Sequence, residues 1–219
     1  MMKMFEQFKN EEDIKEICKK YNIQNYTINS YGSIDVNGNV DLSHRKLSKI
    51  PLNFNKVSGN FWIHNNNLTS LEGCPKEVGK WFSCSDNNLT SLEGCPKFVD
   101  GRFSCSNNKL TTLEGCPDII YDDFECAYNM FTLFTLKDFP MKIDGYLNIC
   151  GNPISIIDSS IEVGGDVYIN RTNFDNKIKE LSQEKLRILF EHGIDYDIFR
   201  KDGSINDSRL ERMFKDFNL

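Results

Sequence analysis

Residues Phe82 to Pro96 read Phe-Ser-Cys-Ser-Asp-Asn-Asn-Leu-Thr-Ser-Leu-Glu-Gly-Cys-Pro, and this stretch decides the fold because it recurs along the chain. Nearly the same sequence begins at Phe61 and again at Phe103, at equal distances on either side of Phe82. A fixed period of about 21 residues is typical of repeat architectures, in which each unit stacks on its neighbours. The sequence therefore predicts one elongated solenoid within the 219 residues.

Each unit is marked by two apolar residues with one residue between them. The pairs follow one another at nearly equal steps and are Val40/Leu42, Phe61/Ile63, Phe82/Cys84, Phe103/Cys105, Phe124/Cys126, Leu147/Ile149 and Val167/Ile169. Such alternation places the paired residues on one face of a short strand and their neighbours on the other. About seven units are therefore expected, each with one strand of a parallel β-sheet.

Five units carry an asparagine three residues after the second apolar position: Asn66, Asn87, Asn108, Asn129 and Asn152. A buried asparagine at a strand exit can hydrogen-bond backbone groups that a turn leaves unpaired, so these residues are expected to form a structural ladder. Prolines recur on the return path, at positions 51, 75, 96 and 117. Because proline fixes φ and lacks an N–H donor, the convex side is expected to be extended or polyproline-like.

The pattern apolar-x-apolar-x-x-Asn-x-apolar, here Phe82-x-Cys84-x-x-Asn87-x-Leu89, resembles the leucine-rich repeat signature. Its short period is similar to that of compact bacterial-effector repeats, and the Leu-Glu-Gly-Cys-Pro wording is similar to repeat proteins of large phages and other viruses. The similarity covers about residues 40–174, and the first and last units depart from it with Arg45 and Thr172 at the asparagine place. The resemblance implies a leucine-rich repeat solenoid with a parallel sheet on its concave face.

The segments outside the repeats are expected to cover the ends of the stack. Within residues 1–37, Ile14, Ile17, Cys18 and Tyr21 fall at helical spacing, segments 26–28 and 34–36 alternate like strands, and Asn37-Gly38 predicts a two-residue hairpin turn leading into Val40. Within residues 175–219, apolar residues at helical spacing predict two amphipathic helices. We therefore expect a helix-and-hairpin N-terminal cap (1–37), repeats (38–174) and a helical C-terminal cap (175–219).

Composition narrows the classes of partner. The net charge is −6, and no cluster of Lys and Arg suggests a nucleic-acid backbone as partner. The first ten residues contain no continuous apolar segment, and no apolar run approaches the ~20 residues that span a bilayer. The chain is therefore expected to be cytoplasmic, in the host cytoplasm if it is phage or viral, with no nucleic-acid or membrane partner. The sequence leaves the oligomeric state open.

Six of the eight cysteines fall on two repeat ladders, Cys74, Cys95 and Cys116 and then Cys84, Cys105 and Cys126. Three members cannot all pair within a ladder, parallel Cβ vectors fit a disulfide poorly, and no Cys-x-x-Cys spacing suggests zinc. Reduced core thiols are expected, with no metal and no cofactor. Cys150 should face outward, but His64 lies four strands away, so no catalytic pair emerges and we expect no enzyme.

Residues next to the inward pairs should project from the concave sheet, and both tryptophans are among them. The expected partner-binding residues are Trp62, His64, Trp81, Arg102, Asp123, Glu125, Tyr146, Asn148 and Tyr168. Trp, Tyr and Arg often dominate protein interfaces, and Asp123 and Glu125 would offer an acidic patch to a basic element of the partner. A middle strip of serines is expected to leave room for a protruding loop. The competing interpretation is that one tryptophan only shields the N-terminal hairpin.

These observations favour a non-enzymatic module that binds a partner protein on its concave face. The resemblance implies a phage, viral or effector protein that blocks or redirects a host protein. One alternative is the substrate-recognition part of an enzyme such as an effector-type ubiquitin ligase, although the roughly 45 residues after Phe174 contain no cysteine nucleophile. Another alternative is a self-assembling structural protein joined through its end caps, since every solenoid must cover the edges of its sheets.

Overall fold

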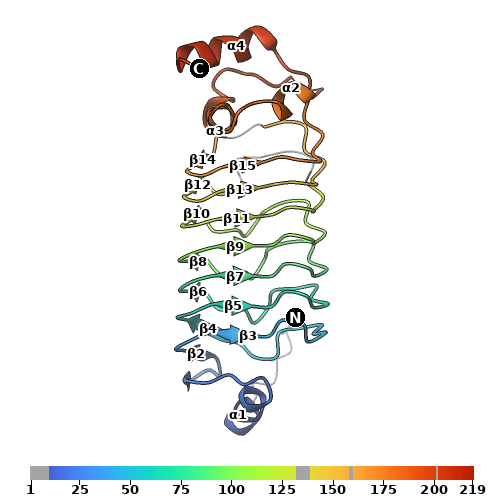
Figure 1. Cartoon of the computed structure of the whole chain (residues 1–219). Coiled ribbons are helices and arrows are strands. Elements are labelled where there is room, and N and C mark those ends of the chain that lie inside the picture. Colours follow the sequence, from blue (N-terminus) through green and yellow to red (C-terminus); the bar gives the residue numbers. More distant parts are fainter. Residues whose placement is uncertain (1–9, 132–138, 158–159, 201) are drawn as a thin grey trace, which may run out of the picture.

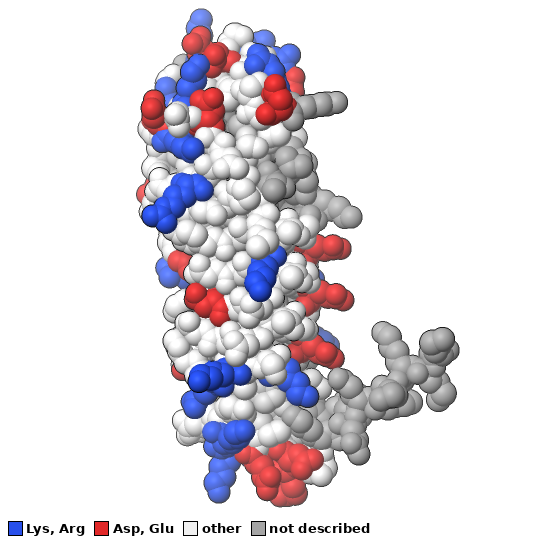
Figure 2. All heavy atoms as spheres, turned by 90° about the vertical axis from the view of Figure 1, so that its right-hand side faces the viewer, with Lys and Arg blue, Asp and Glu red and all other residues white. Residues whose placement is uncertain are grey.

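The chain winds into a column of stacked coils, with helix α1 at one end and helices α2 to α4 at the other (Figure 1). This computed structural model describes residues 10–131, 139–157, 160–200 and 202–219. Residues 1–9 of the expected N-terminal cap therefore lie outside the described residues. The column runs straight in two views at right angles (Figures 1 and 2), and the surface predicted as concave is called the front face below.

Seven strands that begin at the first residue of each apolar pair form one parallel sheet, the front sheet. They are β3 (Val40–Asp41), β5 (Phe61–Trp62), β7 (Phe82–Ser83), β9 (Phe103–Ser104), β11 (Phe124–Glu125), β13 (Leu147–Asn148) and β15 (Val167–Tyr168). Val40 pairs with Phe61, and the same register continues to Leu147 and Val167. Seven strands bound six turns of nearly equal length, which confirms the predicted parallel-sheet solenoid and its period.

A second set of strands forms another side of the column, called the flank below (Figure 1). Each of these strands precedes a front strand in the sequence. These strands are β4 (Phe54–Val57), β6 (Glu77–Val78), β8 (Phe98–Val99), β10 (Ile119–Ile120), β12 (Lys142–Ile143) and β14 (Glu162–Val163). Together with β1 (Tyr26–Ile28) and β2 (Ile34–Val36), they form a five-stranded sheet, β1-β2-β4-β6-β8, and a three-stranded sheet, β10-β12-β14. The return path is thus extended in these segments. It also forms ladders, because equal coil lengths bring the same backbone groups of successive turns side by side.

The first strands of the flank form a hairpin. β1 (Tyr26–Ile28) pairs antiparallel with β2 (Ile34–Val36), and β2 pairs in parallel with β4. The hairpin turn is closed by the N–H of Asn29, which donates to the carbonyl of Ser33 at 2.8 Å. The prediction of a hairpin turn at Asn37-Gly38 is wrong, because β2 and β3 belong to different sheets and the chain passes there from the flank to the front.

The interior consists of parallel columns of apolar side chains, to which each coil contributes one residue per column. The rings of Phe61, Phe82, Phe103 and Phe124 are fully buried one above another, with centroids 6.2, 5.0 and 5.7 Å apart. Each such ring contributes on the order of 1.5–3 kcal/mol by leaving water. A single coil buries its ring only against its neighbours, so the coils are stable as a stack rather than singly.

A buried asparagine holds each turn at the strand exit. The side chain of Asn87 donates to the carbonyls of Ile63, Cys84 and Ser85 at 3.0, 3.0 and 3.1 Å, and its Oδ1 accepts from the N–H of Leu68 at 2.9 Å. Corresponding bonds recur at Asn66, Asn108, Asn129 and Asn152. Each side chain bonds its own coil and the coil before it, so it fastens successive turns together.

The residue before each asparagine place has left-handed backbone. The φ values are 56° at His44, 53° at Asn65, 55° at Asp86, 54° at Asn107, 52° at Tyr128, 71° at Gly151 and 60° at Arg171. Asn, Asp and Gly tolerate this conformation well, whereas a bulky residue such as Tyr128 adopts it at a cost. The recurrence shows that every coil leaves the front sheet through the same sharp bend.

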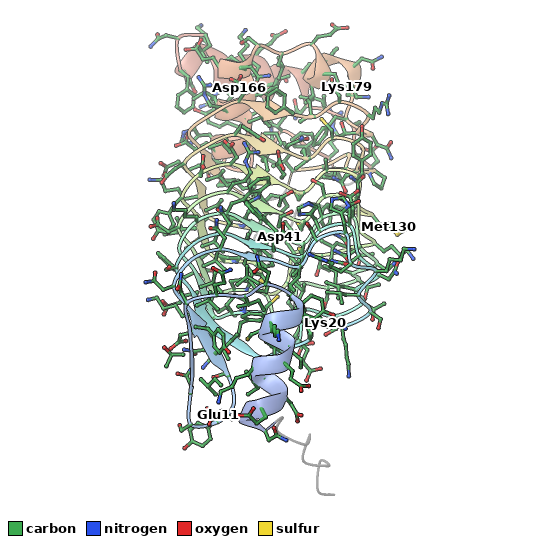
Figure 3. The ribbon with its side chains drawn as sticks, turned by 60° about the horizontal axis from the view of Figure 1, so that its bottom comes forward. Glu11, Lys20, Asp41, Met130, Asp166 and Lys179 are labelled. Carbon is green, nitrogen blue, oxygen red and sulfur yellow. The ribbon has the colours of Figure 1, made fainter. Side chains whose placement is uncertain are left out.

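Helices lie against both ends of the stack. α1 (Glu11–Lys20) buries Ile14 and Cys18 and lies across one end of the coils (Figure 3). At the other end come α2 (Asn176–Lys179), α3 (Gln183–His192) and α4 (Asp207–Asp216). The N–H of Val167 in the last front strand donates to Oε1 of Gln183 at 2.7 Å, so a side chain of α3 replaces the missing next strand. Among the described residues, no helix is both long enough and apolar enough to cross a membrane.

Candidate functional site

The front face carries a continuous group of aromatic and charged side chains, defined here as the front cluster. Its members are Trp62 on β5, Trp81 before β7, Arg102 before β9, Asp123 and Glu125 at β11, Tyr146 before β13, and Tyr168 on β15. Each is adjacent to an inward apolar residue, so strand alternation directs it outward. Tyr168 is exposed and the other members are half-buried. Within the cluster, six successive front strands each contribute at least one large side chain.

Arg102 links the two halves of the front cluster. Its guanidinium lies 5.4 Å from the ring of Trp81 and 5.5 Å from the ring of Tyr146. Its nitrogens lie 2.6 Å from Asp123 Oδ2 and 3.6 Å from Glu125 Oε1. Partial burial lowers the pKa of Arg102, but the hydrogen bond to Asp123 and the nearby anionic groups outweigh it and raise that pKa overall. The cation is therefore permanent and is held between two rings and two carboxylates.

Tyr146 fixes the other side of this arrangement. Its hydroxyl donates to Glu125 Oε1, its backbone N–H donates to Asp123 Oδ1 at 3.1 Å, and its ring meets that of Tyr168 edge-on at 5.5 Å. Burial, followed by the hydrogen bond to Glu125, raises the pKa of Tyr146, so the hydroxyl keeps its proton and remains a donor. The carboxylates predicted as an acidic patch thus have partners within the chain.

The tryptophans contact each other at the other end of the cluster. The rings of Trp62 and Trp81 pack edge to face, with centroids 5.8 Å apart and an interplanar angle of 80°. Both indole N–H groups and Nδ1 of His64 are enclosed without a hydrogen-bond partner among the described residues. Burial and then the neighbouring His44 lower the pKa of His64, so its imidazole is neutral at pH 7. The two tryptophans thus form an uncharged aromatic end of the cluster, with enclosed ring nitrogens that have no partner within the residues that the structure describes.

The serines between these side chains do not form an open strip. Ser83 and Ser104 are each only 3% exposed and Ser85 is 8% exposed, although all three face outward. The hydroxyls of Ser85 and Ser104 bond each other at 2.7 Å. These three serines are therefore largely enclosed, so the predicted room for a protruding loop is not found beside them.

The remaining predicted residues have ordinary local roles. Oδ1 of Asn148 accepts from the N–H of Cys150 at 3.1 Å, and burial raises the pKa of the Cys150 thiol. All eight cysteines are free thiols. Burial raises the pKa of Cys95 to about 12 and that of Cys84 well above its usual value. In the described ranges, no three His, Cys, Asp or Glu side chains converge as metal ligands.

One exposed aromatic pair lies away from the front cluster and was not singled out from the sequence. Phe98 on β8 and Tyr121 after β10 are 42% and 45% exposed, with ring centroids 5.6 Å apart. Phe98 occupies the position that Glu77 occupies in the preceding coil. This replacement of a charged residue by an aromatic one is the sequence signal that could have revealed the pair. Across the column, by contrast, Figure 2 shows a largely uncharged surface edged by a row of acidic side chains.

No protein-family model, curated protein or solved structure matches this chain.

Proposed function

We propose that this chain is a non-enzymatic interaction module that binds a partner protein through the front cluster. The observation that carries the proposal is the contiguous run of Trp62, Trp81, Arg102, Tyr146 and Tyr168 across the front sheet, joined by ring–ring and cation–π contacts. Trp, Tyr and Arg are the residue types that most often supply the binding energy of protein interfaces.

The rigidity of the cluster supports this function. Arg102 and Tyr146 are each restrained by more than one contact, to Asp123 and Glu125 as well as to aromatic rings. Side chains that are already ordered lose little rotamer freedom when a partner binds. The free protein therefore holds these groups in a defined arrangement, and less of the interaction energy is lost in ordering them.

The internal ion pairs also define the chemistry of the partner. One guanidinium faces two carboxylates, so the centre of the cluster carries a single excess negative charge, and its hydrogen-bonding groups are largely occupied. The groups left for a partner are the indole surfaces of Trp62 and Trp81 and the exposed ring of Tyr168. We propose that the partner packs apolar or aromatic side chains against these rings. The partner surface around them is expected to carry at most a small positive charge.

The finer class of the fold belongs to the same proposal. We propose a leucine-rich repeat of short period, supported by the asparagine that bonds two successive coils at each strand exit. The resemblance of the Leu-Glu-Gly-Cys-Pro segments supports a phage, viral or effector origin, and with it a host protein as partner in the host cytoplasm. The origin and the host partner rest on sequence resemblance alone.

Affinity capture from native cytosolic extract with mass spectrometry tests the function. Wild type is compared with Trp62→Ala/Trp81→Ala and with Phe98→Ala/Tyr121→Ala, which removes an exposed aromatic pair from the flank instead. Thermal melting first confirms that both variants fold. A protein that is retained by wild type and the flank variant but lost by the tryptophan variant supports the proposal. If the same protein stays bound to the tryptophan variant, the front cluster is not the binding site.

A further inference from the structure

The five-stranded flank sheet ends at β1, whose outer edge has no neighbouring strand among the described residues. Two hydrogen bonds fix the pattern between β1 and β2: the N–H of Asn37 donates to Asn25 O, and the N–H of Asn29 donates to Ser33 O, both at 2.8 Å. These bonds lie on either side of the pair formed by Thr27 and Asp35. Because bonded and non-bonded pairs alternate, Thr27 and Asp35 exchange both backbone hydrogen bonds.

Tyr26 and Ile28 must then turn their backbone groups away from β2. Antiparallel pairing alternates between bonded and non-bonded pairs, so the N–H and C=O of these two residues point to the open edge. Within the described part of the chain, neither residue has another backbone partner. The edge thus presents two donors and two acceptors, spaced as a further strand would require.

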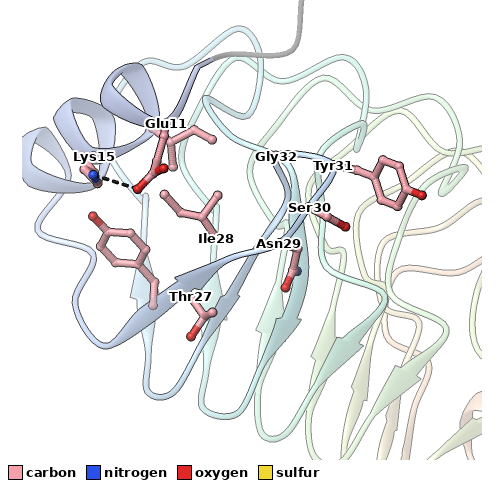
Figure 4. Close-up of a pocket in the computed structure, with 10 residues that line it drawn as sticks. Glu11, Lys15, Thr27, Ile28, Asn29, Ser30, Tyr31 and Gly32 are labelled. Carbon is pink, nitrogen blue, oxygen red and sulfur yellow. Dashed lines mark ion pairs between the residues drawn. The ribbon is translucent and has the colours of Figure 1, made fainter.

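A groove runs beside this edge. It has a volume of about 870 Å³ and lies between α1 and the β1–β2 hairpin. Glu11, Ile14 and Lys15 line it from α1, and Tyr26, Ile28 and Tyr31 line it from the hairpin. Figure 4 shows Ile28 on the side of β1 that faces α1 and Thr27 on the opposite side. An added strand would therefore find a helix on one side and solvent on the other.

The lining sets the character of the occupant. Nζ of Lys15 lies 2.8 Å from Glu11 and 3.1 Å from Glu12, so the cationic group that lines the groove is already paired. Ile14 is buried and Ile28 is half-buried, and together they provide an apolar wall. The edge therefore matches an extended backbone whose inward side chains are uncharged and apolar.

We propose that β1 binds an extended segment of a partner polypeptide as the sixth strand of the flank sheet. The segment pairs antiparallel with β1 through the N–H and C=O groups of Tyr26 and Ile28. It directs an apolar side chain toward Ile14 and Ile28 and an outward polar one past Thr27. Main-chain bonds supply affinity and the groove supplies selection, as in other cases of strand addition. This surface is separate from the front cluster and does not depend on its function.

Amide hydrogen exchange of the full chain with added peptides tests the proposal. The probes are capped hexapeptides in which Thr alternates with Val, Ile, Leu or Tyr. Binding should slow exchange of the Tyr26 and Ile28 amides by about fivefold or more, the effect of one net hydrogen bond, and leave Thr27 unchanged because it already bonds β2. N-methylation of every second residue of the peptide should abolish binding when the methylated amides face β1. Methylation of the other set of alternate residues should not. Failure of every peptide to protect these amides would overturn the proposal, as would equal effects of the two methylation patterns.

A matched pair of variants isolates the backbone. Ile28→Pro removes an outward N–H, which an edge strand tolerates, and shortens the side chain to three carbons; Ile28→Val shortens it equally but keeps the N–H. Peptide binding should be lost in the first and change by no more than about fourfold in the second, given one lost methylene. Trp62→Ala/Trp81→Ala should bind the peptides as wild type does. Concentration-dependent dimerisation that disappears in Ile28→Pro would assign the edge to a second copy and contradict the proposal.

Discussion

The guanidinium of Arg102 lies 2.6 Å from the carboxylate of Asp123, which occupies the same position of the next coil. The pair is 34% and 15% exposed, so it is screened less than an ordinary surface pair. It joins two coils across the front sheet, at the point where the aromatic rings of the cluster meet.

Arg102→Gln should lower the free energy of unfolding by about 1–2 kcal/mol, because Asp123 and Glu125 would face each other without a cation and the half-buried carboxylates would lose a charged donor. Urea unfolding at neutral pH measures the change. Arg187→Gln is the control, since Arg187 lies 3.8 Å from the half-exposed Asp166 and should change stability by less than about 0.5 kcal/mol. Equal effects of the two substitutions would contradict the role given to Arg102.

Asn87→Ala should cost on the order of 1–3 kcal/mol, because buried carbonyls of two coils and the N–H of Leu68 lose their partner. Asn88→Ala removes a neighbouring asparagine that does not take part in this ladder, and it should stay within about 0.5 kcal/mol of wild type. Both variants should retain front-cluster binding. Denaturant midpoints that move together would show that the position of Asn87 in the turn carries no special stability.

Gly151→Ala should destabilise the sixth bend by about 1–2 kcal/mol or more. The backbone has φ of 71°, and an added Cβ would lie 2.4 Å from Cδ1 of Tyr128. Combining it with Tyr128→Ala removes the ring and should recover the steric part of the loss while leaving the backbone part. A double-mutant cycle by thermal unfolding gives the coupling, and strictly additive effects would argue against contact between the two residues.

Stability should fall as the pH rises above about 9. The pKa of the buried Cys95 thiol is raised from 9.0 to about 12, and burial raises that of Cys105 well above 9.0. The unfolded chain therefore releases these protons at a pH where the folded chain keeps them, so their contribution is complete below pH 9 and is lost through pH 12. Each such thiol adds up to about 1.4 kcal/mol per pH unit to this slope. Urea unfolding across this range should show a shallower slope for Cys105→Ala; an unchanged slope would contradict the assignment.

The period of the sequence was enough to predict the front sheet, because equal spacing forces Phe61, Phe82 and Phe103 into one register. The flank ladders were not predicted, since two-residue strands such as Glu77–Val78 show no alternation that a sequence pattern can reveal. Asn37-Gly38 has a strong local turn preference, but in this fold the segment connects β2 of the flank sheet to β3 of the front sheet. Outward positions of the cluster followed from alternation. The pairing of Arg102 with Asp123 did not, because it depends on the rotamers chosen between two aromatic rings.

Every coil leaves the front sheet through the same left-handed bend, so successive units have matching ends. A unit begins and ends in the same backbone conformation, so one whole unit can be removed or inserted without altering the junctions at either side. Each such event changes the column by one strand spacing, about 4.8 Å. The distance between the open edge at β1 and the helices at the far end is thus counted in whole coils. The number of repeats therefore sets how far the β1 edge lies from helices α2 to α4.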